Sequence, residues 1–127
     1  MRLAGVLTLA ALLACGTALA QEGNPYNGKW TATWLGAKSG TPNRADVVIQ
    51  DRGGTFENQR STRSNPCVGI KAPISVTVAT KDELVFVIEF SKALGGCKDS
   101  EVRLKPVDVD TLKGLRAGKQ EMTLKRK

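Results

Sequence analysis

Alternation of apolar and polar residues between Ile74 and Phe90 constrains this chain more than any other feature of its sequence. From residue 74 to residue 78 every second position is isoleucine or valine, which puts Val78 on the inner face and Ala79 on the outer one. In residues 84–90 every second position is leucine, phenylalanine or isoleucine. This is the period of strands with one buried face. Because the polar segment between the two runs is short, we expect an antiparallel hairpin.

Similar alternation continues along the rest of the chain, with glycine, proline or aspartate at the breaks. The expected strands are residues 28–35, 45–50, 55–60, 74–80, 84–90, 101–107, 111–116 and 121–126. No helix of useful length is indicated after residue 20. The pattern predicts one all-β domain, residues 28–127, folded as a small antiparallel up-and-down barrel of about eight strands. A β-sandwich is the alternative, and the barrel is favoured because closure leaves no exposed edge strand.

The first 20 residues have the pattern of an export signal. Arg2 supplies a positive start, residues 3–13 are apolar, and Ala18-Leu19-Ala20 forms a small-residue cleavage site before Gln21. The apolar stretch is too short for a membrane-spanning helix. We therefore expect a periplasmic or secreted bacterial protein with no transmembrane segment, which begins with a loose polar arm, residues 21–27. In the alternative, residues 12–15 resemble a lipobox and Cys15 is lipidated.

Removal of the signal segment would leave two cysteines, Cys67 and Cys97, placed just before and just after the central hairpin. An even number of cysteines in an exported chain indicates a disulfide. A redox pair or a metal site is not indicated, because the chain has no C-x-x-C spacing and no histidine.

Positive charge dominates the composition. The whole chain has a formal net charge of +7, and loss of Arg2 would leave 18 basic against 12 acidic residues, or +6. Outside the cytoplasm such a protein meets acidic polysaccharide, lipopolysaccharide or acidic proteins. A nucleic-acid partner is not expected, because residues 91–127 contain no aromatic side chain for base stacking.

The opening of the first expected strand, Asn27-Gly28-Lys29-Trp30-Thr31, resembles the Gly-x-Trp opening of calycins, which include lipocalins, avidins and small bacterial protease inhibitors. The resemblance implies an up-and-down barrel with Trp30 as a plug at the closed end and a ligand or partner at the open end. Biotin binding is not expected, since the chain has only two tryptophans. The Thr-Asp-Tyr motif of lipocalins is also missing, because Tyr26, before the first strand, is the single tyrosine.

Two basic groups and one tryptophan are candidates for binding. A Cys67–Cys97 disulfide would gather Arg60, Arg63, Lys92 and Lys98 at one end of the sheet, where they could hold a phosphate, sulfate or carboxylate. Trp34 lies on the inner face near the barrel mouth and either lines a pocket or fills the core. A second basic set is expected on outward positions of the last three strands, where neighbouring cations repel unless an anion lies across them. It comprises Arg103, Lys105, Lys113, Arg116, Lys125, Arg126 and Lys127.

Catalysis is not expected from this sequence. Without histidine the chain lacks the commonest general base and the most usual zinc ligand. Asp108 and Asp110 lie in a turn, where aspartate is frequent for backbone reasons. We expect a non-enzymatic binding protein with no metal and no cofactor, which engages an anionic ligand or, in the manner of an inhibitor, a protein partner through loops at the barrel end. The alternative function is a structural protein of the cell envelope, anchored through Cys15.

Overall fold

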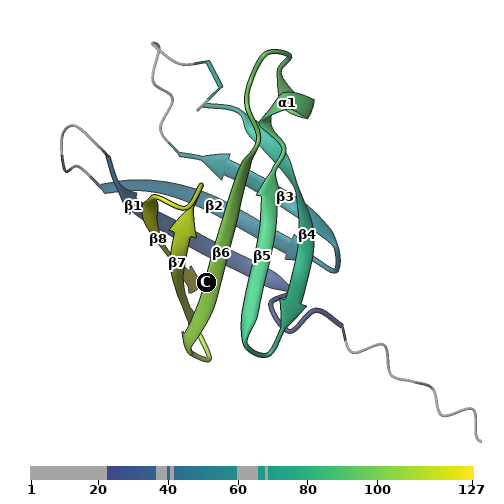
Figure 1. Ribbon diagram of the computed structural model, residues 1–127, viewed down its shortest axis with the longest axis vertical. Helices are drawn as coiled ribbons and strands as arrows, with labels where there is room; N and C mark the ends of the chain where they lie inside the picture. The colour runs from purple at the N-terminus through teal and green to yellow at the C-terminus, as the bar shows by residue number, and fades with distance from the viewer. Residues whose placement is uncertain (1–22, 37–39, 41, 60–65, 68) are drawn as a thin grey trace, which may run out of the picture.

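The chain folds into a closed barrel of eight antiparallel strands with one short helix (Figure 1). The computed structural model describes residues 23–36, 40, 42–59, 66–67 and 69–127, so the predicted signal segment and Cys15 lie outside the described residues. The elements are β1 (Gly28–Leu35), β2 (Pro42–Gln50), β3 (Gly53–Asn58), β4 (Lys71–Thr80), β5 (Glu83–Ile88), α1 (Phe90–Ala93), β6 (Ser100–Asp108), β7 (Thr111–Arg116) and β8 (Gln120–Arg126).

Each strand pairs with its neighbours in the sequence, and β8 pairs with β1 to close the sheet. The closing ladder is short: it joins Trp30–Thr33 of β1 to Thr123–Arg126 of β8. The prediction of an up-and-down barrel is therefore confirmed, and the sandwich alternative is not the fold of this chain. In Figure 1, β1–β3 cross behind β4–β7, as strands on opposite walls of a tilted barrel do.

The structure corrects the sequence-based prediction in two places within the central hairpin. A bulge in β4 shifts the register between Val76 and Val78. Beyond the bulge Ala79 packs against the core, so the predicted inward position of Val78 is wrong. The second run also ends early: β5 stops at Ile88, and Phe90 begins α1 instead of continuing the strand.

Apolar side chains fill the interior of the barrel. Trp30, Phe56 and Phe86 are fully buried, together with aliphatic residues from every strand except β3. Ala32 and Ala45 face each other in the β1–β2 ladder, and these two small residues leave room for the neighbouring aromatic rings. An eight-stranded barrel either is filled by its side chains or holds one small ligand, and buried apolar side chains fill this one. Candidate binding sites are therefore at an end or on the outside.

The two ends of the barrel are built differently. Tight turns connect β2 to β3, β4 to β5 and β6 to β7 at one end, which faces the lower right of Figure 1. We call it the plugged end, because residues 24–27 cross it. The other end, with α1 and the longer connections between β1 and β2, β3 and β4, and β5 and β6, is the loop end.

Residues 24–27 are fastened to the barrel and do not form the loose arm expected from their composition. Tyr26 is buried and its hydroxyl donates to the Thr80 carbonyl. The Asn24 side chain donates to the Asp51 carbonyl at 2.8 Å. Asn27 is held twice, since its Oδ1 accepts the Asp51 amide at 2.6 Å and its Nδ2 donates to the Asp51 carboxylate at 3.1 Å.

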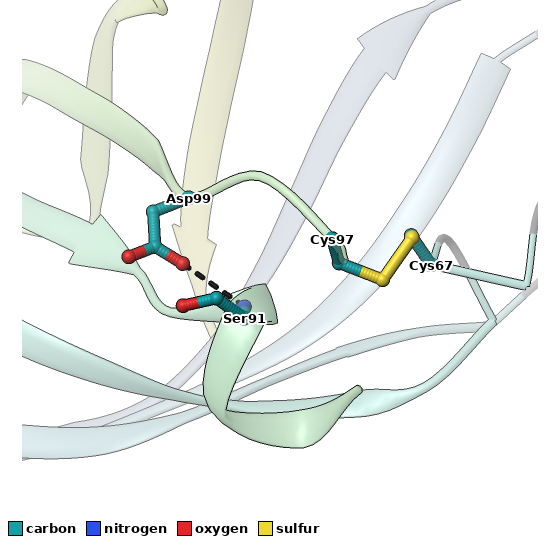
Figure 2. The surroundings of a disulfide bond; sticks show 4 residues. All are labelled: Cys67, Ser91, Cys97 and Asp99. Carbon is teal, nitrogen blue, oxygen red and sulfur yellow. Dashed lines mark hydrogen bonds between the residues drawn. A yellow bond between two sulfur atoms is a disulfide. The ribbon is translucent and has the colours of Figure 1, made fainter. Parts of the chain in front are cut away.

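The predicted disulfide is present and joins the β3–β4 connection to the segment between α1 and β6 (Figure 2). Cys97 is buried against the core. Nearby, the Ser91 amide donates to the Asp99 carboxylate at 3.0 Å, which ties the start of α1 to the residues that lead into β6. This hydrogen bond also lowers the pKa of Asp99 below its usual value. The disulfide and this hydrogen bond thus help to fix the loop end.

Replacing both cysteines by serine tests the stabilising role of the disulfide. The link closes a loop with a sequence separation of 30 residues. Its loss should lower the free energy of unfolding by roughly 3–4 kcal/mol, because the unfolded chain regains conformational entropy. Urea titration followed by tryptophan fluorescence measures the change. A loss below about 1 kcal/mol would show that the loop end does not depend on this link.

Gly114 should not tolerate a side chain, although it lies in the middle of β7. A Cβ atom there would lie 1.8 Å from the Arg103 carbonyl oxygen of β6. We expect Gly114→Ala to destabilise the protein by about 1–3 kcal/mol through this backbone clash. Gly95→Ala is the matched control, since nothing lies within 4 Å of a Cβ at Gly95. Equal unfolding free energies for the two variants would refute the close β6–β7 approach.

Candidate functional site

Two arginines of the last strands point into the barrel, one at each end. The inner face of β7 carries Leu112, Gly114 and Arg116, and that of β8 ends with Arg126. The expectation that Arg116 and Arg126 lie on outward positions is therefore wrong. Both follow apolar inner-face residues by an even number of positions, so strand geometry places them inside despite their charge.

Arg126 belongs to the structure of the plugged end. Its guanidinium lies over the Trp30 ring, with Cζ 4.2 Å from the ring centroid. Nη1 donates to the Asn27 carbonyl at 2.9 Å, Nη2 to the Pro25 carbonyl at 3.4 Å, and Nε lies 3.6 Å from the Asp110 carboxylate. The Trp30 indole in turn donates to the Tyr26 carbonyl at 2.8 Å. Arg126 therefore has a structural partner for each of its nitrogens, and Trp30 is completely buried beneath it.

Arg116 occupies the corresponding place at the loop end with far fewer partners. Its Nε donates to the Ser100 hydroxyl at 3.0 Å. Cζ lies 5.9 Å from the centroid of the Trp34 ring and 5.6 Å from that of Phe90. None of the ion pairs within the described part of the chain includes Arg116. Burial lowers the pKa of this guanidinium, as expected for a cation removed from water without an acidic neighbour.

Two aromatic rings, Trp34 and Phe90, lie against this cation, and Phe56 packs against both of them. Trp34 and Phe56 have ring centroids 6.0 Å apart, and Phe56 meets Phe90 edge-on at 6.1 Å. All three rings are buried, and they come from β1, β3 and the first residue of α1. The cluster gives Arg116 an apolar floor that attracts a cation but cannot neutralise it.

An open groove lies where β1 and β8 part, and its lining includes two neighbours of Arg116, Trp34 and Gln120, but not Arg116 itself. The ladder between these strands stops at Thr33 and Thr123, and beyond that point the Gln120 amide donates to the Leu35 carbonyl at 3.4 Å. The groove has a volume of about 570 Å³. Its lining is Thr33, Trp34, Leu35, Pro42, Lys119, Gln120, Glu121 and Thr123. Trp34 connects the groove to the Arg116 cluster, because it lines the one and packs in the other.

The basic residues that the sequence suggested do not form this site. Lys92 is exposed and pairs with Glu89 at 3.0 Å, and Lys98 is exposed in the segment that leads into β6. Arg60 and Arg63 lie outside the described residues. Arg116 was missed as a site residue because it was placed on the outer face. The signal that could have found it is Leu112, four positions earlier on the same inner face.

Comparison with protein family models, curated proteins and solved structures found no match to this chain. Within the described ranges, no three His, Cys, Asp or Glu side chains gather as potential metal ligands. In the same residues no helix is long and apolar enough to cross a membrane. The function must therefore be inferred from the geometry of the barrel.

The two inward arginines should respond differently to replacement by methionine. Arg126→Met should lower the free energy of unfolding by about 1–3 kcal/mol, because the partly buried Asn27 carbonyl loses its donor and the Trp30 ring loses the guanidinium that covers it. Arg116→Met should leave it unchanged within about 0.5 kcal/mol or raise it, because a cation without a counter-ion leaves an apolar site. Urea unfolding of both variants measures this. An Arg116→Met loss as large as that of Arg126→Met would mean that Arg116 is structural.

Proposed function

We propose that this chain is an exported, non-enzymatic binding protein that takes an anionic ligand with an apolar body at the loop end of its barrel. The observation that carries the proposal is Arg116, an inward cation beside an open groove with one hydrogen-bond partner and no counter-ion among the described residues. A carboxylate, sulfate or phosphate group would supply the missing charge.

Arg116 loses part of its hydration on folding, and contacts within the protein replace only some of it. Arginine stays protonated in proteins, so burial leaves its positive charge in a poorly solvated place. One neutral hydroxyl and two aromatic faces offset this in part. The remaining donors of the guanidinium have a planar arrangement that suits two oxygens of one anion. Residues kept in such a state at the expense of stability are typical of binding sites.

The groove supplies the apolar part of the proposed site. Leu35 is 62% exposed at its rim, beside Pro42 and the edge of Trp34. Gln120 is paired in register with Arg116 and also lines the groove. The polar side chain of Gln120 therefore lies next to the apolar wall of the groove. This combination of an apolar wall with a few polar groups is common in sites for small molecules. A ligand with an acid group and an aromatic or aliphatic body fits it.

Export is part of the same proposal. The Cys67–Cys97 disulfide supports it, because such links persist in oxidising compartments. The signal pattern of the first 20 residues supports it independently. Mass spectrometry of the protein from a bacterial host should show an N-terminus at Gln21 and no free thiol. An acylated N-terminal Cys15 would favour the anchored envelope protein instead.

An aromatic sulfonate dye is a direct probe of the site. Anilinonaphthalene sulfonate should bind the folded protein with fluorescence enhancement, and Arg116→Gln should raise its Kd at least tenfold, or about 1.4 kcal/mol. Arg103→Gln, on the outer face, should change the Kd less than twofold. Far- and near-ultraviolet circular dichroism must show that both variants are folded, since the dye also binds partly unfolded states.

An uncharged analogue separates the charge from the groove. Phenylnaphthylamine has the same aromatic body without the sulfonate, so the wild-type protein and Arg116→Gln should bind it with equal affinity. If Arg116→Gln weakens both compounds equally, the arginine shapes the groove and does not bind the anion. If neither compound binds the wild-type protein, the small-ligand proposal is wrong.

A further inference from the structure

A straight row of outward side chains crosses five strands of the barrel. Lys105 of β6 is in register with Lys113 of β7, and Lys113 with Thr123 of β8. Thr123 is in register with Thr33 of β1, and Thr33 with Arg44 of β2. We call these five residues the Lys–Thr row. With strands about 4.8 Å apart, it extends about 19 Å over the curved surface.

No carboxylate interrupts the Lys–Thr row, and its cations are exposed. Lys105, Lys113 and Arg44 take part in none of the ion pairs within the described residues. Of the carboxylates in the two neighbouring rows, Asp46 is paired with Lys127. Glu121, two positions from Thr123 on β8, and Asp108, at the β6 end, take part in none of the ion pairs within the described residues. Glu83 of β5, which lines the same shallow hollow as Lys105, lies beyond the β6 end of the row.

The pairing of Lys105 with Lys113 is unfavourable in the isolated protein. Like charges directly opposite each other on adjacent strands repel and destabilise the ladder. Lys125 lies in the next row, between Thr111 and Thr31, and adds to the positive field. An anion that lies across the strands would turn this repulsion into attraction, and the two threonine hydroxyls in the middle of the row could donate to it.

We propose that the Lys–Thr row binds a linear anionic polysaccharide, whose acidic groups meet the cations at the two ends while its chain crosses the threonines in between. The row carries no aromatic side chain on which bases could stack, which disfavours a single-stranded nucleic acid. It also carries no apolar side chain to enter a lipid surface, which disfavours a membrane. Thr33 and Thr123 also line the groove near Arg116, but the cations of the row, Lys105, Lys113 and Arg44, are not part of that site, so their substitution tests this proposal separately.

The proposal is tested by measuring the affinity of the full mature protein for heparin. The triple variant Lys105→Gln, Lys113→Gln, Arg44→Gln should raise the Kd for heparin at least tenfold. The slope of log Kd against log salt should also fall by about two to three, as expected when three charge contacts are lost. The matched control is Lys71→Gln, Lys81→Gln, Arg52→Gln, which removes the same charge from exposed positions off the row. Its Kd should rise less than threefold.

Equal weakening in the row variant and the control would overturn the proposal, since net charge alone would then explain binding. Tighter binding of duplex DNA or anionic vesicles than of heparin at the same salt concentration would overturn it as well. Arg116→Gln should bind heparin like the wild-type protein. Its dye affinity and its heparin affinity therefore report on the two proposals separately.

Discussion

Closure of the sheet between β8 and β1 is the contact on which the remaining structure depends. The ladder pairs Trp30–Thr33 with Thr123–Arg126, and without it two strands would be left as open edges. Arg126 reinforces the closure, because its Nη1 bonds the Asn27 carbonyl, 99 positions away, while its guanidinium covers Trp30. The start of β1 and the end of β8 are thereby fixed to each other at the plugged end, and the interior above Trp30 fills with apolar side chains.

The same closure explains why the loop end differs from the plugged end. The ladder stops at Thr33 and Thr123, so β1 and β8 part before they reach the loops. Trp34 and Arg116 stand at the position where Trp30 and Arg126 stand at the other end. Among the residues that the structure describes, no segment equivalent to residues 24–27 supplies carbonyls to Arg116. Arg126 therefore has protein partners for all its nitrogens, whereas Arg116 keeps N–H donors that a ligand in the groove could use.

Much of the fold follows from the sequence, because two-residue periodicity is a local property. The strands at residues 28–35 and 111–116 have the predicted bounds, and the barrel and the disulfide are as expected. The bulge in β4 was not predictable, since its register shift depends on pairing with β5. Arg116 and Arg126 were misplaced because the general rule that charges face water was given more weight than the alternation that Leu112 and Leu124 define. The Lys–Thr row required the register of five strands, which no single stretch of sequence contains.

The difference between the two arginines is the central claim, and NMR of their side chains tests it most directly. Naphthoate can be titrated into protein labelled with ¹⁵N while the Nε–H signals of Arg116 and Arg126 and the indole N–H signals of Trp30 and Trp34 are followed. The account predicts saturable shifts for Arg116 and Trp34, with Arg126 and Trp30 unchanged. Equal small shifts for both arginines, or none at Arg116, would contradict it.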